Sequence, residues 1–485
     1  MLPTNESGSR EERAAATTAH VGGTRRWFQR ATYVASVFAR YGFGPVMQRL
    51  GMGHFVPRRF KPSGEELSLP ERLRLALEEL GPVGVKLGQV LASRPDLLPA
   101  EYLSELRKLT DNVDPFPFEQ AREVVEEELK ASIEEVFVEF GQEPVAAASL
   151  GQVHKARLRT GQQVAVKVQR PDAAAVVEMD LQILLGVARL AERYSKALQE
   201  ARVAEFALEF GHVLRNELNY YVEAYRTDCL REALARYDYA KVPFVYWNYT
   251  TRRVLVTEWC RGARLEELTR GSVQGINLKA AAHNIGSLLL LQIFVLGFFH
   301  GDPHPGNLLV QPGERIVLLD CGNVQSVSRK MRQSLSNLLG AVLSEDPEAV
   351  LDEILEIGVV SDDTDLQVLA LDVDRMLSRY TSVRETEIHA GEVIDQMLSL
   401  VFRHRVRVPP VLGAMARTLL VGEGVCRMLD SDFDFRKVAA ATLPAVVRGG
   451  LTGLTFERLR QDGHQMVRLA RLLPRQLSRL LVRVN

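Results

Sequence analysis

The pattern of hydrophobic and polar positions predicts helices on both sides of a short region of period-two alternation. Residues 25–52 alternate basic with aromatic or aliphatic positions, which predicts an amphipathic helix that ends near Gly51. Gly81-Pro82 predicts the end of a second helix. That helix is expected to begin with a capping box over Ser68 to Glu71 and to carry one apolar stripe of Leu69, Leu73, Leu77 and Leu80.

The middle of the chain changes to the pattern of a β-sheet. Residues 145–159 and 163–168 alternate as two strands joined by Thr160-Gly161, which predicts a hairpin. Residues 173–236 return to helical spacing and 242–257 to strand. The remainder is mostly helical, with a strand pair at 308–310 and 316–319. This order predicts an α+β fold, with helices followed by a small β-rich lobe and then a helical lobe.

Composition and charge exclude several classes of protein. A chain of 485 residues is too long for one ordinary domain, and 46% hydrophobic with 25% charged residues is typical of a globular protein. The net charge of −1 gives no basic field for nucleic acid. The cysteines are scattered without a CxxC pair, which argues against a zinc ribbon or a disulfide framework and favours a reducing compartment.

Four segments bear on membranes. The first 20 residues are polar with several acids, unlike a secretory signal, and are expected to be a disordered tail. Residues 285–299 are apolar but shorter than the ~20 needed to span, so we expect a buried core helix and no transmembrane helix. From Arg448 onward the sequence contains eight arginines and only two acids, with leucine and valine between them. This pattern predicts either an interfacial helix at anionic lipid or a helix packed on its own domain. The helix at 25–52 leaves the same two alternatives.

The strongest chemical signal is HGDPHPGNLLV at 300–310, followed by RIVLLDCGNV at 315–324. Asp302 and Asn307 have the spacing of a kinase catalytic loop, where the carboxylate orients the attacking oxygen and the amide binds magnesium. Asp320 occupies the place of the magnesium-binding Asp of a DFG motif. A triphosphate needs hard cations held by oxygen ligands, so these residues predict binding of ATP with Mg²⁺.

Upstream, VAVKV places Lys167 where a kinase lysine contacts the α and β phosphates. Glu217 is the expected carboxylate partner, with Glu223 as the reserve; on one helix the two acids would point about 120° apart. Glu258 and Cys260 lie where a hinge strand would offer its backbone to adenine.

The expected phosphate-covering loop lacks a glycine-rich pattern. It contains Ala146, Ala147, Ala148 and Ser149, which reach positive φ less readily than glycine, so the backbone should approach a nucleotide differently.

Together these segments resemble the UbiB family of atypical kinase-like proteins. Its KxGQ signature appears as Lys86 to Gln89, its alanine-rich loop as AAASLGQVHKA, its catalytic loop as HGDPHPGN, and its DFG position as DCG. The resemblance covers residues 25–435. It implies a two-lobed protein-kinase-like fold in which the KxGQ helix lies over the active site and hinders protein substrates, with Lys86 and Gln89 as active-site contacts. It also implies ATPase activity connected with ubiquinone biosynthesis or lipid homeostasis.

The predicted organisation combines this resemblance with the patterns above. It comprises a disordered tail (1–24), an N-terminal helical extension with KxGQ (25–135), a kinase-like N-lobe (136–261), a kinase-like C-lobe (262–435) and basic amphipathic C-terminal helices (436–485). Three departures stand out: Asn219 where the family's ExD motif has Asp, Cys321 where DFG has Phe, and a C-terminus without the transmembrane pair of many bacterial relatives.

Four functions fit these residues to different degrees. An atypical kinase or ATPase handling isoprenoid quinone precursors or other lipid is the leading hypothesis, with a nucleotide-binding pseudokinase scaffold as the alternative. An ordinary serine/threonine kinase and a metal hydrolase built on His300, Asp302 and His304 are weaker. Expected partners are ATP, quinone precursors or anionic lipid, and a second copy or a pathway complex; the expected location is cytoplasmic, peripheral at the inner membrane.

Overall fold

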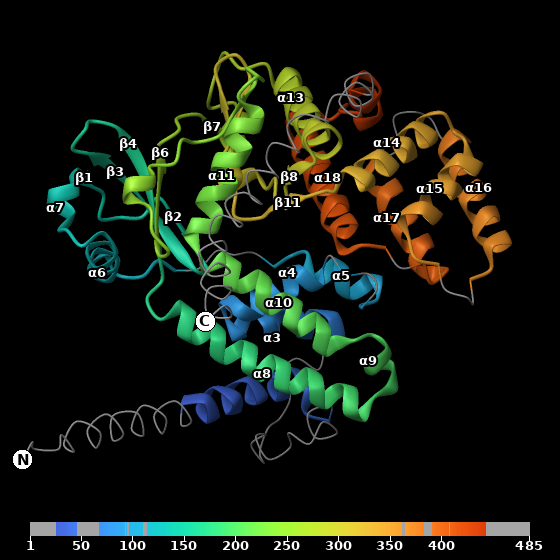
Figure 1. The fold of residues 1–485 in the computed structure, drawn as a ribbon, viewed down its shortest axis with the longest axis horizontal. Coiled ribbons are helices and arrows are strands. Elements are labelled where there is room, and N and C mark those ends of the chain that lie inside the picture. The colour runs from blue at the N-terminus through green and yellow to red at the C-terminus, as the bar shows by residue number, and fades with distance from the viewer. Residues whose placement is uncertain are drawn as a thin grey trace, which may run out of the picture. The chain divides into compact units, whose positions relative to one another are not determined.

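The structure is a computed structural model that describes residues 26–45, 67–92, 94, 97–109, 114–360, 364–382, 390–406 and 408–442. The chain divides into two compact units, coloured along the sequence in Figure 1. Unit 1 is Met1–Arg236, Lys241–Arg261 and Val317–Asn323; unit 2 is Tyr237–Ala240, Gly262–Ile316 and Val324–Asn485. The predicted tail at 1–24 and most of the predicted C-terminal helices lie outside the described residues.

Unit 1 begins with helices. A helix over residues 26–38 runs into the π-helix η1 (Ala39–Phe43), followed by α3 (Leu69–Leu80), α4 (Pro82–Leu91) and α5 (Ala100–Leu106). The capping box of Ser68 and Glu71 is confirmed, as is the end of α3 at Gly81, whose φ is +85°. The predicted stripe is only partly right, because Leu69 in the first turn is 50% exposed while Leu77 and Leu80 are buried.

An antiparallel sheet forms the centre of unit 1. Its strands are β1 (Phe137–Phe140), β2 (Ala146–Ala148), β3 (Gly151–Leu158), β4 (Gln163–Gln169) and β6 (Val254–Glu258), in the order β1-β3-β4-β6 with β2 paired to β3. The hairpin turn at Thr160-Gly161 is confirmed. The predicted strand over 145–159 is broken, because the chain turns back at Ser149 and Leu150 to pair β2 with β3. Alternating valines such as Val164, Val166 and Val256 face helix α6 (Phe118–Leu129), with α7 (Ile133–Val136) beside it.

The remaining helices of unit 1 are α8 (Ala173–Tyr194), α9 (Lys196–Glu200), α10 (Val203–Glu217) and α11 (Tyr220–Leu234). Val83 of α4, Leu181 of α8 and Phe210 of α10 pack into one core cluster that also contains Leu150, from the turn between β2 and β3. Buried apolar contacts therefore hold helix α4 against the alanine-rich hairpin of β2 and β3. The 3-10 turn η3 (Trp247–Tyr249) precedes β6, and the short β5 (Ala240–Lys241) lies at a unit boundary.

Unit 2 is mainly helical. Its first part contains β7 (Ala263–Arg264), α12 (Leu265–Thr269), α13 (Leu278–Leu290), the π-helix η4 (Leu291–Leu296), β8 (Phe298–His300), the 3-10 turn η5 (Pro305–Asn307), β9 (Leu308–Gln311) and the start of β10 (Arg315–Leu318). β9 pairs with β7, and β8 pairs with β11 (Val324–Ser326). Then follow α14 (Arg329–Leu343), α15 (Pro347–Ile357), α16 (Leu366–Ser382), α17 (Ala390–Arg403) and α18 (Pro410–Leu429). The strand pair near 308–319 was predicted; β8 and β11 were not.

One helical stretch in the described part of the chain is long and apolar enough to cross a bilayer. It is Leu278–Leu296, and 61% of its most apolar window is buried inside the protein. Ile285, Leu288 and Ile293 are almost fully buried there. This agrees with the prediction of a core helix, although the helix ends at Leu296 and Phe299 belongs to β8.

Candidate functional site

Lys167 on β4 is the centre of a charged cluster in unit 1. Its Nζ donates to both carboxylate oxygens of Glu223, at 2.8 and 2.9 Å, and to Oδ2 of Asp320 at 3.2 Å. The face of the Tyr220 ring lies 5.3 Å from the ammonium. Burial lowers the pKa of Lys167, but the carboxylates of Asp320 and Glu223 outweigh it and hold the pKa well above its ordinary value. The lysine therefore stays charged, as a phosphate ligand must.

The expectation that Glu217 orients Lys167 is wrong. Helix α10 ends at Glu217, and a new helix, α11, begins at Tyr220 with Asn219 as its N-cap, whose Oδ1 accepts from the Tyr221 N–H. The two glutamates thus lie on different helices, and the angle calculated for one continuous helix does not apply. Glu223, the reserve candidate, is buried in the first turn of α11 and reaches the lysine.

Asn219 has a structural explanation. Asn and Asp are both good N-caps, so the departure from the family's ExD pattern keeps the local fold of α11. The Asn219 side-chain oxygen accepts the hydrogen bond that caps α11.

Asp320 is fixed by its own turn. Its Oδ1 accepts from the Gly322 N–H at 2.8 Å, and the Gly322 carbonyl accepts from Arg226 of α11. Cys321 between them is fully buried against α11, and burial raises the pKa of its thiol, with Asp320 adding to the rise. The cysteine therefore packs against α11, the helix that bears Glu223.

Helix α4 brings the KxGQ signature to the same unit. Lys86 Nζ lies 3.4 Å from Oε2 of Glu217. Gln89 donates to the Leu109 carbonyl at 3.4 Å, a contact that holds α4 to the following chain. Gly88 is required by packing, because a Cβ there would lie 2.1 Å from Leu109 Cδ1.

The alanine-rich segment is a short hairpin rather than an open loop. Ala146, Ala147 and Ala148 form β2, and Ser149 is buried in the turn. Gly151 opens β3 so close to α11 that a Cβ would lie 2.3 Å from the Tyr220 hydroxyl. The backbone of this hairpin is therefore positioned by direct contact with the helix that carries Glu223.

The proposed hinge follows β6. The Glu258 N–H donates to the Phe244 carbonyl at 2.8 Å, its carboxylate pairs with Lys241, and Cys260 is buried. The Glu258 N–H and carboxylate are thus used within the protein, as is the Trp259 N–H, which donates to the Gln163 carbonyl at 3.0 Å.

The catalytic-loop sequence lies in unit 2 between β8 and β9. Asn307 Nδ2 donates to the Asp302 carbonyl at 3.1 Å, which directs the amide nitrogen inward and leaves Oδ1 as the acceptor end. The Asp302 N–H donates to His300 Nδ1 at 3.2 Å, and the Gly306 N–H donates to His304 Nδ1 at 3.2 Å. Both histidines therefore shape the turn.

Arg417 of α18 was not singled out from the sequence. Its guanidinium lies 3.9 Å from Oδ1 of Asp302. An arginine inside a long apolar helix is the signal that could have identified it, because such a cation needs a polar partner.

The oxygen donors suit a hard cation. Asp320 is 44% exposed and offers a carboxylate, and Asn307 offers an amide oxygen, the ligand types that Mg²⁺ takes together with phosphate oxygens. Within the described residues no group of three or more His, Cys, Asp and Glu is arranged to hold a metal by itself. The His300, Asp302 and His304 hydrolase hypothesis thus gains no support from the geometry.

Comparison with known proteins identifies the family. The ABC1 atypical kinase-like domain matches residues 108–354 and the UbiB helical domain matches 373–434. The uncharacterized protein slr0889 of Synechocystis sp. is 34% identical over 74% of this chain and 90% of its own length. The chloroplastic protein ACTIVITY OF BC1 COMPLEX KINASE 1 of Arabidopsis thaliana is 35% identical over 76% of this chain, which spans only 54% of that protein.

Another relative is longer, and one solved structure is similar in fold. The uncharacterized protein sll0005 of Synechocystis sp. is 34% identical over 80% of this chain, which spans just over half (56%) of the relative. The structure of Rv3197 from Mycobacterium tuberculosis, solved as a complex with erythromycin, matches with a TM-score of 0.51 and 23% identity over 73% of this chain and 90% of that one, which supports the fold alone. The domain matches and the relatives together show that the chain belongs to the ABC1/UbiB family of atypical kinase-like proteins.

Proposed function

We propose that the protein binds MgATP and turns it over as an atypical kinase or ATPase. Lys167 contacts the α and β phosphates and is oriented by Glu223; Asn307 and Asp320 hold Mg²⁺; Asp302 orients water or a substrate hydroxyl. The roles of Asp302 and Asn307 rest on the order of the motifs along the chain. Bound magnesium would neutralise the phosphate charge that develops during transfer.

The observation that carries the proposal is the contact of Lys167 with Glu223 and Asp320. Glu223 is buried, which raises the pKa of its carboxyl to about 7, and the Lys167 ammonium opposes that rise and favours the charged carboxylate. In kinases the corresponding lysine and helix glutamate must pair before phosphates are positioned. Lys167, the proposed phosphate ligand, is therefore held by two carboxylates.

The organic substrate is proposed from the family alone. We place the activity in isoprenoid quinone biosynthesis or lipid homeostasis, on the cytoplasmic side with peripheral attachment to a membrane. ATP hydrolysis is favoured over phosphorylation of other proteins, because α4 carries Lys86 to Glu217 and packs on the turn of the alanine-rich hairpin. A protein substrate would have to approach past that helix.

The alternative is a nucleotide-binding pseudokinase scaffold. Asn219 and Cys321 depart from the family's motifs, and such departures would favour a pseudokinase. In the structure Asn219 caps α11, and Cys321 is buried against α11. Both residues therefore stabilise the helix that carries Glu223, which argues against a catalytically inactive pseudokinase.

ATP hydrolysis by the full chain tests the proposal. With magnesium, and with or without anionic liposomes, wild type should release phosphate, while Lys167→Ala and Asp302→Asn should lose at least tenfold. Lys196→Ala is the matched control, since Lys196 is 87% exposed on α9. Turnover that persists in Lys167→Ala would refute the assignment. MgATP binding without turnover under every condition would support the scaffold instead.

A further inference from the structure

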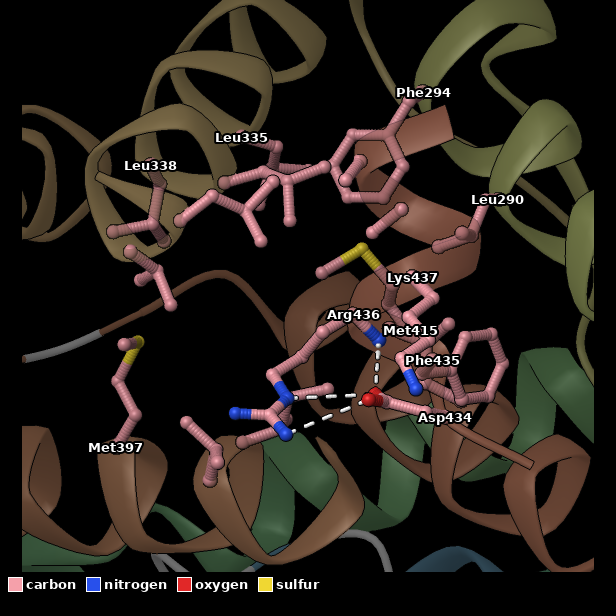
Figure 2. A pocket seen from close by; sticks show the side chains of 18 of the residues that line it. Leu290, Phe294, Leu335, Leu338, Met397, Met415, Asp434, Phe435, Arg436 and Lys437 are labelled. Atoms are coloured by element: carbon pink, nitrogen blue, oxygen red, sulfur yellow. Dashed lines mark hydrogen bonds and ion pairs between the residues drawn. The ribbon is translucent and has the colours of Figure 1, made fainter. Parts of the chain in front are cut away.

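Unit 2 contains an apolar pocket that none of the kinase-like motifs uses. Its volume is about 450 Å³, and its walls come from α13, η4, α14, α16, α17, α18 and the segment after α18. Figure 2 shows the side chains that surround it, including Phe294, Leu335, Met397 and Met415. Small-molecule sites typically enclose roughly 300 to 1,000 Å³, so the volume is that of a ligand site.

The lining is mostly apolar. Sixteen of its 20 residues are apolar. The other four are Glu345, Asp434, Arg436 and Lys437, two acids and two bases whose charges cancel. Arg436 and Asp434 contact each other, and the Arg436 N–H also donates to Asp434 Oδ1 at 2.8 Å. A pocket with balanced charge gives no electrostatic preference for an anion.

These walls fit a hydrocarbon ligand better than water or a peptide. A water in the pocket would need two to four polar partners, and a peptide would bring backbone N–H and C=O groups that also need partners. A pocket of about 450 Å³ has room for a small organic molecule rather than for a single water.

Two features of the walls suit a ligand that enters and leaves. Met397 and Met415 supply flexible thioether side chains that adapt to irregular apolar shapes. Phe294 stands on the π-helix η4, and π-helical turns are uncommon and occur frequently at functional sites.

We infer that this pocket binds an uncharged, hydrocarbon-rich small molecule, such as a lipid-like alcohol with a prenyl or acyl chain. The binding step needs no nucleotide. Only the further idea that the ligand is the lipid handled during ATP turnover rests on the proposed function.

The pocket also shares a helix with the arginine that lies beside the catalytic-loop carboxylate. Helix α18 carries Met415 and Leu419 in the pocket wall and Arg417, which lies 3.9 Å from Asp302. A ligand in the pocket would therefore contact the same rigid element that carries the cation beside Asp302.

The test is displacement of the uncharged dye Nile red from the full-length protein by farnesol, an uncharged prenyl alcohol. Dye fluorescence should rise on mixing with protein and fall on addition of farnesol, whereas palmitate, which carries a carboxylate, should displace the dye at least tenfold less well. Leu338→Trp fills the pocket and should weaken farnesol binding at least tenfold. Leu371→Trp is the matched control, because Leu371 on α16 is 55% exposed and outside the lining.

A second variant and a separate readout keep the result decisive. Val342→Phe is a smaller filling change in the same wall, and the melting temperature of each variant identifies one that fails to fold. Farnesol displacement that is equal in wild type and in a folded filled variant would overturn the inference, as would stronger displacement by palmitate or no dye binding at all. ATP hydrolysis measured on the same samples separates failure of this site from failure of the proposed function.

Discussion

Exchange of Glu223 for glutamine tests the choice between the two glutamates. Glu223 makes two close contacts with Lys167, at 2.8 and 2.9 Å, and is 10% exposed. A hydrogen bond to a charged group contributes ~1.5 to 3 kcal/mol, and Asp320 would still contact the lysine. We therefore expect Glu223→Gln to lower the free energy of unfolding by about 2 kcal/mol.

The matched variant is Glu217→Gln. Glu217 pairs with Lys86 at 3.4 Å, and the two side chains are 24% and 21% exposed. Partly exposed pairs of this kind contribute about 0 to 1 kcal/mol. The loss of stability should therefore be less than half that of Glu223→Gln.

Turnover should separate the variants more clearly than stability does. If Glu223 positions Lys167 for the α and β phosphates, a loss of about 2 kcal/mol in transition-state stabilisation corresponds to roughly a 30-fold fall in kcat/KM, because ~1.4 kcal/mol is tenfold. Urea unfolding and steady-state phosphate release measure the two quantities on the same preparations. Equal losses in the two variants, or a larger loss for Glu217→Gln, would refute the reasoning.

Three further predictions concern other parts of unit 1. Gly88→Ala should lower the free energy of unfolding by ~1 to 3 kcal/mol through overpacking, whereas Gly186→Ala on α8, where a Cβ has nothing within 4 Å, should be neutral or stabilising in the same urea titration. Burial lowers the pKa of His154, so the unfolded chain takes up its proton more readily and stability should fall as the pH drops below about 6.5; His154→Gln should flatten that pH dependence, and an unchanged slope would contradict it. Mass spectrometry after brief iodoacetamide treatment of native protein should find Cys229 modified before the fully buried Cys321.

The pH prediction rests on a fixed hydrogen-bond network. Gln152 uses its amide on both backbone groups of Phe116, accepting at 2.9 Å and donating at 3.2 Å. Its orientation is therefore set, and the His154 Nε2 atom, 2.9 Å from the Gln152 nitrogen, must be an acceptor. The other ring nitrogen, Nδ1, lies 2.8 Å from the Gly141 carbonyl and donates to it. This tautomer is neutral, and a second proton would face the amide N–H.

Much of the fold followed from local sequence signals. The capping box at Ser68, the Gly81-Pro82 break and the Thr160-Gly161 turn were predicted because each depends on residues close together in the chain. β8 and β11 were missed because strands of three residues are too short to show a period, and they exist through pairing across the sequence.

The candidate site was predictable in its motifs but not in its pairing. Lys167 and Asp320 were found from their neighbours, and the structure brings them together. Glu217 was taken as the partner of Lys167 from its place in the segment NELNYYVEA, and both acids were assigned to one continuous helix. Asn219 was the overlooked signal: a good N-cap residue marks a new helix, which puts Glu223 in a first turn. Arg417 lies far along the chain from Asp302, and no local pattern connects them.

We propose that the cluster of Lys167, Glu223 and Asp320 binds the nucleotide through magnesium. Calorimetric titration of ATP into wild type and Asp320→Asn, each with Mg²⁺ and with EDTA, tests it most directly, with Asp432→Asn as the control because Asp432 is 82% exposed. If Asp320 holds the magnesium, we expect magnesium-dependent binding in wild type and in the control, and a loss of at least tenfold in affinity for Asp320→Asn. Equal magnesium-dependent affinity in all three proteins would contradict it.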